Sequence, residues 1–575
     1  LVLAAAIWIG GIPAALVITP VIGGCAILSF GGLAGRLAGP RWAPAAAAVL
    51  ALSLPQQYTS RSTFSEPLAQ VLLFGGLCLL IDSMVIRRST AGASIGASAS
   101  TGTGPRATSG TTHYPTQDIV LAALAGLTLG LTILVRIDGL SDILPAVPFL
   151  GILLAAGRRQ GIPFGIGLVT GVGYGLADGY ILSRPYLDLE APSLRPLALI
   201  TGLVILLTVV GILLSWGRKA LARRPGWLPR QLIRWLPAAA AIATVLVFVG
   251  FAVRPLVQTV AGETDPTSIA YVAELQKLAG LPVDGKLQYY QDSLYWVIWY
   301  IGLPAVLLGA FGLALLARRC TRALLTWKDP DAEARIWALP LLIALWVIVT
   351  VLWRPAVSPD QPWAGRRLVP FVLPGLILGA IWATAWLRER AGLLGRNQIT
   401  SAVVATFCVA SLLIPAALTN LDVGFVRNSS GSGSHLSAHG MAFRTIGAGE
   451  LTAVNKLCRA IGPDASVVIL DSLTADRFAQ LIRGMCDTPT AQLTVVSPAT
   501  VSAVVIGIRK AGRRPVLLAQ YESELTPFGG SPTEVLNLLT TQEAHNLTAP
   551  PTRTWLIHYT VWLSQPFTGG TPPAT

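Results

Sequence analysis

The sequence PLALITGLVILLTVVGILLSW, residues 196–216, contains no charged side chain and is long enough to cross a lipid bilayer as one helix. With 53% hydrophobic and only 12% charged residues, the whole chain has a composition unlike that of soluble domains. The sequence therefore predicts a polytopic α-helical membrane domain of about twelve spans. The other predicted spans are residues 17–35, 42–56, 67–86, 119–135, 143–157, 162–182, 236–253, 293–317, 336–353, 368–386 and 399–419.

Basic residues occur in every second loop between the apolar runs. Because cytoplasmic loops are enriched in Lys and Arg, these loops are expected inside the cell and the region after residue 419 outside. The net charge of +14 thus reflects topology in the plasma membrane and not binding to nucleic acid, which would gather the charge on one face or tail. The basic loops are residues 36–41, 87–106, 158–159, 218–234, 318–335 and 388–396.

The predicted membrane domain covers residues 1–420 and contains two long loops. Residues 89–117 are rich in Ser, Thr, Gly and Ala, which is typical of a flexible linker, here on the cytoplasmic side. Residues 254–292 form an outer loop that contains SIAYVAELQKLAGL, a stretch with a helical pattern. We expect this stretch to pack at the membrane interface.

The region after the last span changes character. Residues 421–445 include a Gly/Ser linker, NSSGSGSHLSAHG, and residues 446–575 alternate helix-like with strand-like stretches. ELTAVNKLCRAIG and DRFAQLIRGMC have helical spacing, SVVILD resembles a strand, and AVVIGIRKAGRRPVLLAQ holds two strand-like runs. This pattern predicts a small extracytoplasmic α/β domain. The Asp that ends SVVILD suggests a nucleotide pocket or a structural role, and no glycine-rich phosphate loop follows it.

Two cysteines and two histidines of this region raise the question of a disulfide and of a metal site. Cys458 and Cys486 share an oxidising compartment, which makes them a candidate disulfide between the two predicted helices. His435 and His439 are four residues apart but flanked by Gly and Ser, so they are a poor candidate for a metal site.

Charged residues at the outer ends of spans are the candidates for chemistry, because ionisable groups near hydrocarbon need a partner or a polar substrate. Glu66 precedes a predicted span, where a helix N-terminus favours an anion, and it is either a helix cap neutralised by Arg61 or a site residue. Arg136 and Asp138 form either a self-satisfied ion pair or a pair facing a polar substrate.

Two further candidates lie near later spans. Arg366 and Arg367 precede a span on the outer side, where they bind either lipid headgroups or a phosphate in bidentate fashion. Asp292 lies in KLQYYQDSLYWVIWY, whose aromatic residues indicate an anchor at the membrane interface or a substrate contact.

Four stretches together resemble the multi-span glycosyltransferases of the GT-C superfamily, in its branch of bacterial protein mannosyltransferases and aminoarabinose transferases. They are LAGRLAGPRWAPAAAAVLALSLP, YTSRSTFSEPLAQVLLFGGL, ILVRIDGL and GRRLVPFVLPGL, and the resemblance covers about the first 420 residues. It implies transfer of a sugar from a polyprenyl-phosphate donor to a glycan, lipid or protein acceptor of the cell envelope, at the outer membrane face.

The resemblance also implies roles for individual residues. Glu66 takes the place of an acidic residue close to the active site, which makes it the candidate catalytic residue. Arg136 lies near the donor phosphate or sugar, and Arg366 with Arg367 lies near the lipid phosphate. Arg61, Asp138 and Asp292 are further substrate-binding candidates, the outer domain helps to bind the acceptor, and the cofactor stays open, with a divalent metal ion as one possibility.

One feature departs from the family pattern. The principal catalytic Asp or Glu of such enzymes lies in the first outer loop, and the sequence from Leu1 is expected to begin after that loop. Either the sequence is part of a longer enzyme that carries this carboxylate upstream of Leu1, or the protein is not catalytic as it stands. The alternatives to a transferase are a transporter or flippase of a lipid-linked precursor and a noncatalytic membrane scaffold.

Overall fold

A computed structural model describes residues 2–96, 116–220, 230–325, 332–395, 398–421, 423–427, 434–438 and 444–567. The chain divides into two compact units. The first comprises Leu1–Ala442 together with His545–Pro551, and the second comprises Phe443–Ala544 with Thr552–Thr575. The sequence analysis places the boundary at residues 421–445 and does not anticipate that residues 545–551 belong to the first unit.

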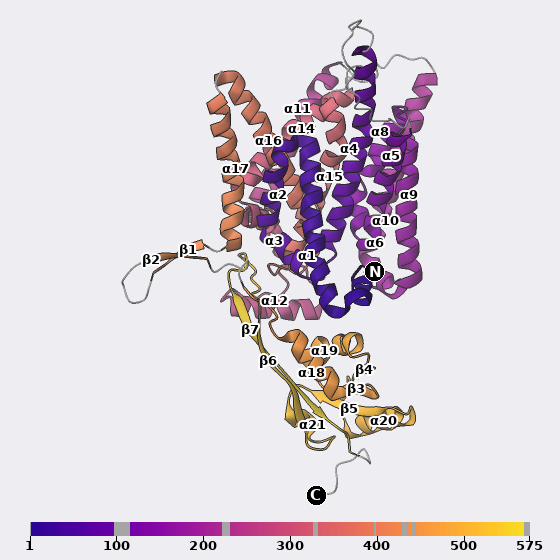
Figure 1. Cartoon of the computed structure of the whole chain (residues 1–575), viewed down its shortest axis with the longest axis vertical. Helices are drawn as coiled ribbons and strands as arrows, with labels where there is room; N and C mark the ends of the chain where they lie inside the picture. Colours follow the sequence, from indigo (N-terminus) through magenta and orange to yellow (C-terminus); the bar gives the residue numbers. More distant parts are fainter. Residues whose placement is uncertain are drawn as a thin grey trace, which may run out of the picture. The chain divides into compact units, whose positions relative to one another are not determined.

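The first unit is a helical bundle, in which the long helices run side by side (Figure 1). Eight of its described helical stretches are long and apolar enough to cross a membrane. They are Val2–Ala38 (α1), Glu66–Val85 within α4 (Glu66–Gly96), Gln117–Val135 across α5 (Gln117–Gly130) and α6 (Thr132–Val135), Leu194–Gly217 within α10 (Arg184–Ala220), Arg234–Val257 within α11 (Arg230–Val257), Leu303–Leu325 (α14), Glu333–Trp353 within α15 (Ala332–Trp353) and Gln398–Leu421 (α17).

Four of the about twelve predicted spans have no counterpart among these eight stretches. Residues 42–56 divide into α2 (Ala43–Leu52) and α3 (Leu54–Arg61), because Pro55 follows the break at Ser53. Residues 143–157 form only the short α8 (Ala146–Ala155), which follows α7 (Gly139–Ile143). The helices α9 (Gly161–Leu182) and α16 (Val372–Gly395) are long, but the glycines of α9 and the charged end of α16 lower their mean hydropathy.

Glycines let α5 and α9 pack with their backbones in contact. A Cβ on Gly126 would lie 2.0 Å from the carbonyl oxygen of Phe164, and a Cβ on Gly167 would lie 2.0 Å from that of Ala123. Real atoms do not approach so closely, so the helices would have to separate. Membrane helices associate mainly through such close packing, because lipid is as apolar as their side chains.

The other elements of the first unit include α12 (Pro266–Leu278), α13 (Ser293–Ile301) and the single-turn segment η3 (Ala364–Leu368). In α12, the Asp265 side chain accepts a hydrogen bond from the Ser268 amide at 2.8 Å and thereby caps the helix that SIAYVAELQKLAGL predicts.

Much of both predicted linkers lies outside the described residues. In the segment predicted as a linker at 89–117, α4 continues to Gly96, and α5 begins at Gln117. In the segment at 421–445, β1 (Val423–Arg427) pairs antiparallel with β2 (Ser434–Ala438), where the sequence predicts no strand. His435 belongs to β2, whereas His439 lies outside the described residues.

The second unit contains a mixed five-stranded sheet in the order β4-β3-β5-β7-β6. The strands are β3 (Ala465–Ile469), β4 (Thr490–Gln492), β5 (Arg514–Ala519), β6 (Thr533–Glu543) and β7 (Thr554–Ser564). β3 is parallel to β4 and β5, whereas β7 is antiparallel to β5 and β6. A helical apolar region followed by an α/β region is the predicted fold class.

Helices cover both faces of this sheet. On one face, Val467 and Ile469 of β3 pack in a core with α18 (Glu450–Ile461) and α19 (Ser472–Met485). On the other face, Val468 packs with α20 (Pro498–Lys510) and α21 (Glu522–Leu525). Successive residues of β3 therefore point to opposite layers, as the pleat of a strand requires.

One strand prediction in this unit is wrong. The run AVVIGI within residues 503–508 belongs to α20, because Ser497 and Thr500 form a capping box and Pro498 occupies the first turn. The β-branched residues alone favoured a strand. Asp471, at the end of SVVILD, accepts hydrogen bonds from the backbone amides of Thr474 at 2.7 Å and Gln520 at 3.1 Å. Its contacts are those of a helix cap.

Cys458 and Cys486 are joined by a disulfide in the structure. Cys458 lies in α18, and Cys486 directly follows α19, so the bond connects the ends of the two helices that cover one face of the sheet. The other four cysteines, Cys25, Cys78, Cys320 and Cys408, form no disulfide and lie within helices of the first unit.

The close approach of α5 and α9 generates a stability prediction. Gly126→Ala should lower the free energy of unfolding of the full chain in detergent by about 1–3 kcal/mol, because the added methyl group forces two helix backbones apart. The matched control is Gly173→Ala in α9, where a Cβ meets no described atom within 4 Å. Thermal unfolding measures both. Equal stability of the two variants would contradict this packing.

Candidate active site

The Glu66 carboxylate lies at the centre of a charged cluster. Glu66 is the first residue of α4, its side chain is 1% exposed, and it forms an ion pair with Arg136. The Nε atom of Arg366 lies 3.6 Å from the Oε1 atom of Glu66. The carboxylate therefore joins three segments that are far apart in the sequence.

Arg136 and Asp138 form a bidentate pair in the turn between α6 and α7. The Nε and Nη2 atoms of Arg136 donate hydrogen bonds to the Asp138 carboxylate at 3.0 and 2.7 Å. Arg367 donates a further hydrogen bond to the Oδ2 atom of Asp138. Because Arg136 also contacts Glu66, the five side chains of Glu66, Arg136, Asp138, Arg366 and Arg367 form one connected cluster. We call it the arginine cluster.

Both consecutive arginines lie in η3, immediately before α16. The guanidinium carbon of Arg366 lies 3.9 Å from the ring centroid of Trp363 and 5.4 Å from that of Phe64, which is the geometry of a cation–π contact. The Nη2 atom of Arg367 donates a hydrogen bond to the Ala356 carbonyl at 3.3 Å. Contacts on several sides therefore fix both guanidinium groups.

Two buried glutamines hold η3 against α4. The side-chain amides of Gln56 and Gln70 hydrogen-bond to each other at 2.9 Å, and Gln70 also donates to the Val369 carbonyl at 2.7 Å. Neither glutamine is more than 1% exposed. Because unsatisfied buried amides are costly, these bonds define where η3 lies relative to Glu66.

The five side chains of the arginine cluster carry an excess of positive charge, because three arginines face two carboxylates. Burial raises the pKa of the nearby Asp142 to about 7, so its carboxyl group offsets part of this excess at neutral pH. Burial raises the pKa of Asp138, but Arg136 and Arg367 outweigh this effect and hold the pKa below its ordinary value. Burial lowers the pKa of Arg366, and the nearby Glu66 opposes that shift. The carboxylate of Asp138 is therefore charged at neutral pH, and the positive excess persists there.

Several polar atoms beside the cluster are buried without a hydrogen-bond partner among the described residues. Three are donors: Nε of Arg366, Nε of Arg367 and Nε2 of Gln361. Two more belong to Ser358 and Asp360. These five atoms lie within ten residues, which is unusual, since buried polar groups normally find partners. Both carboxylate oxygens of Glu66 also lack a hydrogen bond among the described residues. The side chains of Arg366 and Arg367 nevertheless retain 21% and 23% exposure.

Two of the predicted site residues do not belong to the five that define the arginine cluster. Arg61, at the end of α3, donates a hydrogen bond to Gln57 at 3.3 Å. Asp292 lies in the turn before α13, where burial raises its pKa and Arg254 opposes the shift. The aromatic anchors of Arg366 were missed by the sequence analysis as site residues. Trp363, three residues before Arg366, is the signal that was available.

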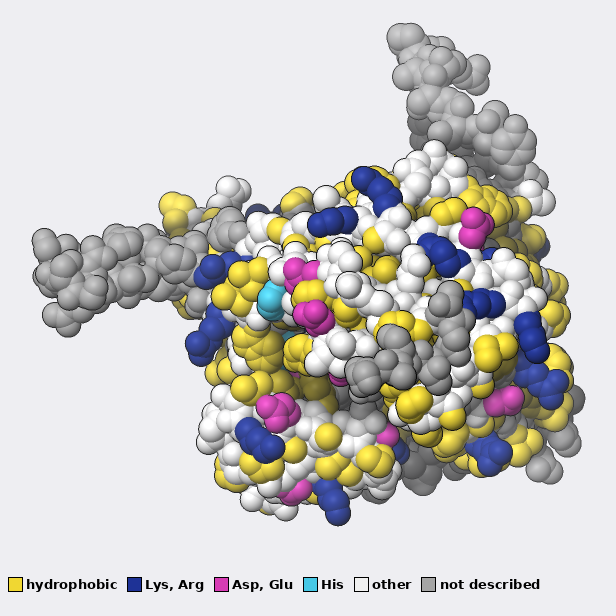
Figure 2. Space-filling model, turned by 90° about the horizontal axis from the view of Figure 1, so that it is seen from below, with side chains coloured by type: hydrophobic (Ala, Val, Ile, Leu, Met, Phe, Trp, Pro, Cys, Tyr) yellow, Lys and Arg dark blue, Asp and Glu magenta, His cyan; other side chains and the backbone are white. Residues whose placement is uncertain are grey.

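Neither a metal site nor a basic surface patch is evident. Among the described residues, no group of three or more His, Cys, Asp and Glu side chains is arranged to hold a metal ion, and the carboxylates of the cluster face arginines. The residues present do not fit a divalent ion, so we assign it no step. On the face shown in Figure 2, Lys and Arg are scattered among other side chains.

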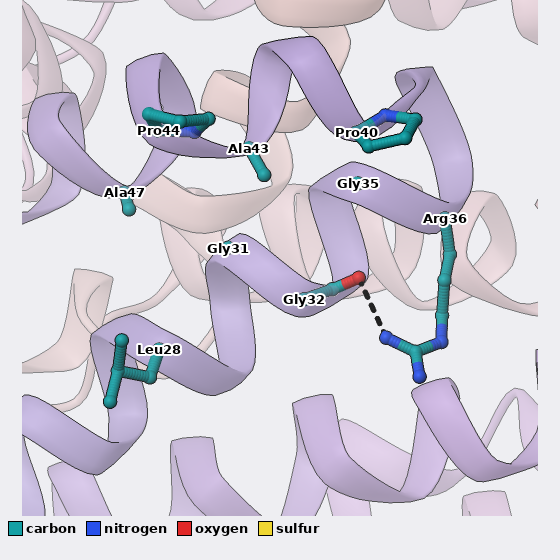
Figure 3. A pocket seen from close by; sticks show the side chains of 9 residues that line it. All are labelled: Leu28, Gly31, Gly32, Gly35, Arg36, Pro40, Ala43, Pro44 and Ala47. Atoms are coloured by element: carbon teal, nitrogen blue, oxygen red, sulfur yellow. Dashed lines mark hydrogen bonds between the residues drawn. The ribbon is translucent and has the colours of Figure 1, made fainter.

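A separate pocket of about 550 Å³ lies between α1 and α2, lined mainly by small residues (Figure 3). Arg36 at its edge donates a hydrogen bond to the Gly32 carbonyl at 3.1 Å and two hydrogen bonds to Asp82 at 2.8 Å. Arg36 belongs to a loop predicted to be cytoplasmic, whereas the arginine cluster belongs to loops predicted to be external. This pocket contributes no side chain to the cluster.

No protein-family model and no curated protein matches the sequence. Two structures of the oligosaccharyltransferase of Archaeoglobus fulgidus are similar to the chain. The AglB complex with an inhibitory peptide and a dolichol-phosphate has 12% identity and a TM-score of 0.41, and the match covers 89% of this chain and 59% of that one. The complex with Zn and sulfate has 11% identity and a TM-score of 0.40, and the match covers 95% of this chain and 63% of that one.

A third similar structure is apo ArnT from Cupriavidus metallidurans, with 12% identity and a TM-score of 0.32. The match covers all of this chain and 87% of that one. The chain thus spans about three fifths of the length of the two oligosaccharyltransferase chains.

The buried position of Glu66 generates a second prediction. Glu66→Gln should lower the free energy of unfolding by about 3 kcal/mol, because it leaves Arg136 buried beside a neutral amide. The matched control is Glu274→Gln, whose partner Lys277 lies 3.6 Å away with both side chains more than 60% exposed; its effect should stay below about 1 kcal/mol. Chemical denaturation of the full chain measures both. An unchanged free energy of unfolding in Glu66→Gln would refute the central role of this ion pair.

Proposed function

We propose that this protein is a membrane glycosyltransferase of the GT-C type, which transfers a sugar from a polyprenyl-phosphate donor to an acceptor of the cell envelope. The observation that carries the proposal is the arginine cluster. It contains two adjacent, partly exposed arginines whose buried Nε donors make no hydrogen bond among the described residues, next to a third arginine fixed by two carboxylates. The Nε atom of Arg366 lies 3.6 Å from Glu66 as an ion pair. Such donors match the oxygens of a phosphate.

The proposed reaction needs positive charge at one defined place. A hydroxyl oxygen of the acceptor bonds to the anomeric carbon of the sugar as the bond from that carbon to the phosphate oxygen breaks. The hydroxyl proton is lost, and negative charge grows on the departing lipid phosphate. Fixed guanidinium groups stabilise that charge without reorganising, which is the main electrostatic source of rate acceleration. Arg366 and Arg367 would supply this stabilisation.

Glu66 serves in this proposal as a positioning residue. Its carboxylate is almost fully buried and faces two arginines, and both conditions hold Arg136 and Arg366 in place. A carboxylate that accepts a proton in the reaction must reach the acceptor hydroxyl, which a 1% exposed side chain does not do in this conformation. The contacts thus favour the electrostatic role over the catalytic role that the sequence resemblance implies.

The location and the acceptor belong to the same proposal. The positive-inside pattern puts the loops that carry Glu66, Asp138 and Arg366 on the outer side of the plasma membrane, and the same count puts the second unit outside. That unit would help to bind a glycan, lipid or protein acceptor. The contacts within the arginine cluster support the prediction that these loops lie on the same side of the membrane, since the ends of three different predicted spans meet there.

Binding of a lipid phosphate tests the proposal. Arg366→Ala combined with Arg367→Ala should weaken binding of undecaprenyl phosphate to the purified full chain at least about tenfold, since each arginine contributes a charge-assisted hydrogen bond. The matched control is Arg354→Ala, an exposed arginine in the preceding loop, which should bind as the original protein does. Intrinsic fluorescence in detergent measures the dissociation constant.

Two further measurements decide between the proposed function and its alternatives. Undecaprenol, the alcohol that lacks the phosphate group, should bind weakly to all variants. Equal binding of undecaprenol and undecaprenyl phosphate would contradict the role of the arginines. In proteoliposomes, a lipid-linked sugar should lose its sugar to an acceptor. Movement of the intact donor across the membrane, with no change in its covalent structure, would instead indicate a flippase.

A further inference from the structure

A second polar cluster lies directly before η3 in the first unit. The Nδ1 atom of His545 lies 2.5 Å from the Oδ2 atom of Asp360, and the hydroxyl group of Tyr271 lies 3.2 Å from the same oxygen and 3.0 Å from that nitrogen. The side chains of Asp360 and His545 are 3% and 15% exposed. Burial raises the pKa of Tyr271, as does Asp360, so its hydroxyl group keeps its proton and donates to the carboxylate.

Backbone hydrogen bonds join the same two segments. Gln361 donates its amide to the Asn546 carbonyl at 2.7 Å, and Asn546 donates its amide to the Gln361 carbonyl at 3.2 Å, as in an antiparallel sheet. The hydroxyl group of Tyr300 donates to the side-chain oxygen of Gln361 at 2.5 Å. Residues 545 and 546 therefore fix residues 360 and 361 through both side chain and backbone.

The fixed residues are close to the arginines. The Ala364 amide donates to the Asp360 carbonyl at 2.7 Å, so the chain turns directly from Asp360 into η3. Arg366 follows Asp360 by six residues, the last three of which belong to η3. Trp363, on which the guanidinium group of Arg366 stacks at 3.9 Å, lies between them. A shift at Asp360 would therefore move the Trp363 ring, on which the guanidinium group of Arg366 stacks.

We propose that His545 is a positioning residue for the arginine cluster, which holds residues 360–363 through Asp360 and thereby orients Arg366 and Arg367 toward a lipid phosphate. This inference rests on the proposed function. A carboxylate accepts hydrogen bonds, so the Nδ1 atom of His545 donates to Asp360, and a charged acceptor makes such a bond strong. The groups that face the imidazole are Asp360 and Tyr271, and Tyr58 interacts electrostatically with Tyr271.

Two variants separate positioning from a general structural role. His545→Ala removes the donor, whereas His545→Asn retains an N–H group at the position of the Nδ1 atom that contacts Asp360. We expect faster amide hydrogen exchange in residues 360–368 and about tenfold weaker binding of undecaprenyl phosphate for His545→Ala, with both properties largely restored in His545→Asn. The control is His558→Ala in β7, which loses a hydrogen bond of 2.8 Å to Asn537 and should change neither property.

The two measurements, made on the full chain in detergent, have distinguishable outcomes. Unchanged exchange in His545→Ala would overturn the inference, as would faster exchange with unchanged binding of the lipid phosphate. Failure of His545→Asn to restore either property would also overturn it. If the original protein bound no undecaprenyl phosphate while His545→Ala exchanged faster, the proposed function would be lost and only the hold of His545 on residues 360–368 would stand.

Discussion

The ion pair between Glu66 and Arg136 is the contact on which the arrangement of the site depends. Glu66 lies at the start of α4 and Arg136 in the turn after α6, and both side chains are buried. A buried carboxylate or guanidinium group is stable only with its partner, so each of the two fixes the other. Arg366 and Asp138 then extend the pair to η3. Three loops are thereby held together at one end of the helical bundle.

The excess of positive charge follows from the same contacts. Glu66 and Asp138 neutralise two of three guanidinium groups, Asp142 offsets part of the remaining charge, and Arg366 and Arg367 are partly exposed. Buried donors of Arg366, Arg367 and Gln361 have no hydrogen-bond partner among the described residues, although the Nε atom of Arg366 lies 3.6 Å from Glu66. An anionic, oxygen-rich ligand would satisfy both conditions. The phosphate of a membrane lipid has this chemistry, and the apolar helices beside the cluster suit its hydrocarbon chain.

Part of this arrangement could be predicted from the sequence. Apolar runs and alternating basic loops indicated a helical membrane domain and put Glu66, Arg136 and Arg366 on the same side, although single helices could not be counted where Pro55 or the glycines of α9 interrupt the pattern. The contact between Asp360 and His545 could not be predicted, because 185 residues separate them and no periodicity reports such a pairing. Likewise, β-branched residues favoured a strand where the capping box of α20 begins a helix.

The central claim is that the arginine cluster binds the phosphate of a polyprenyl lipid. An experimental structure of the full chain in a lipid nanodisc with undecaprenyl phosphate tests it most directly. The account predicts phosphate oxygens within about 3 Å of the guanidinium nitrogens of Arg366 or Arg367. A lipid phosphate bound elsewhere, with the arginine cluster closed by its own ion pairs, would contradict the account.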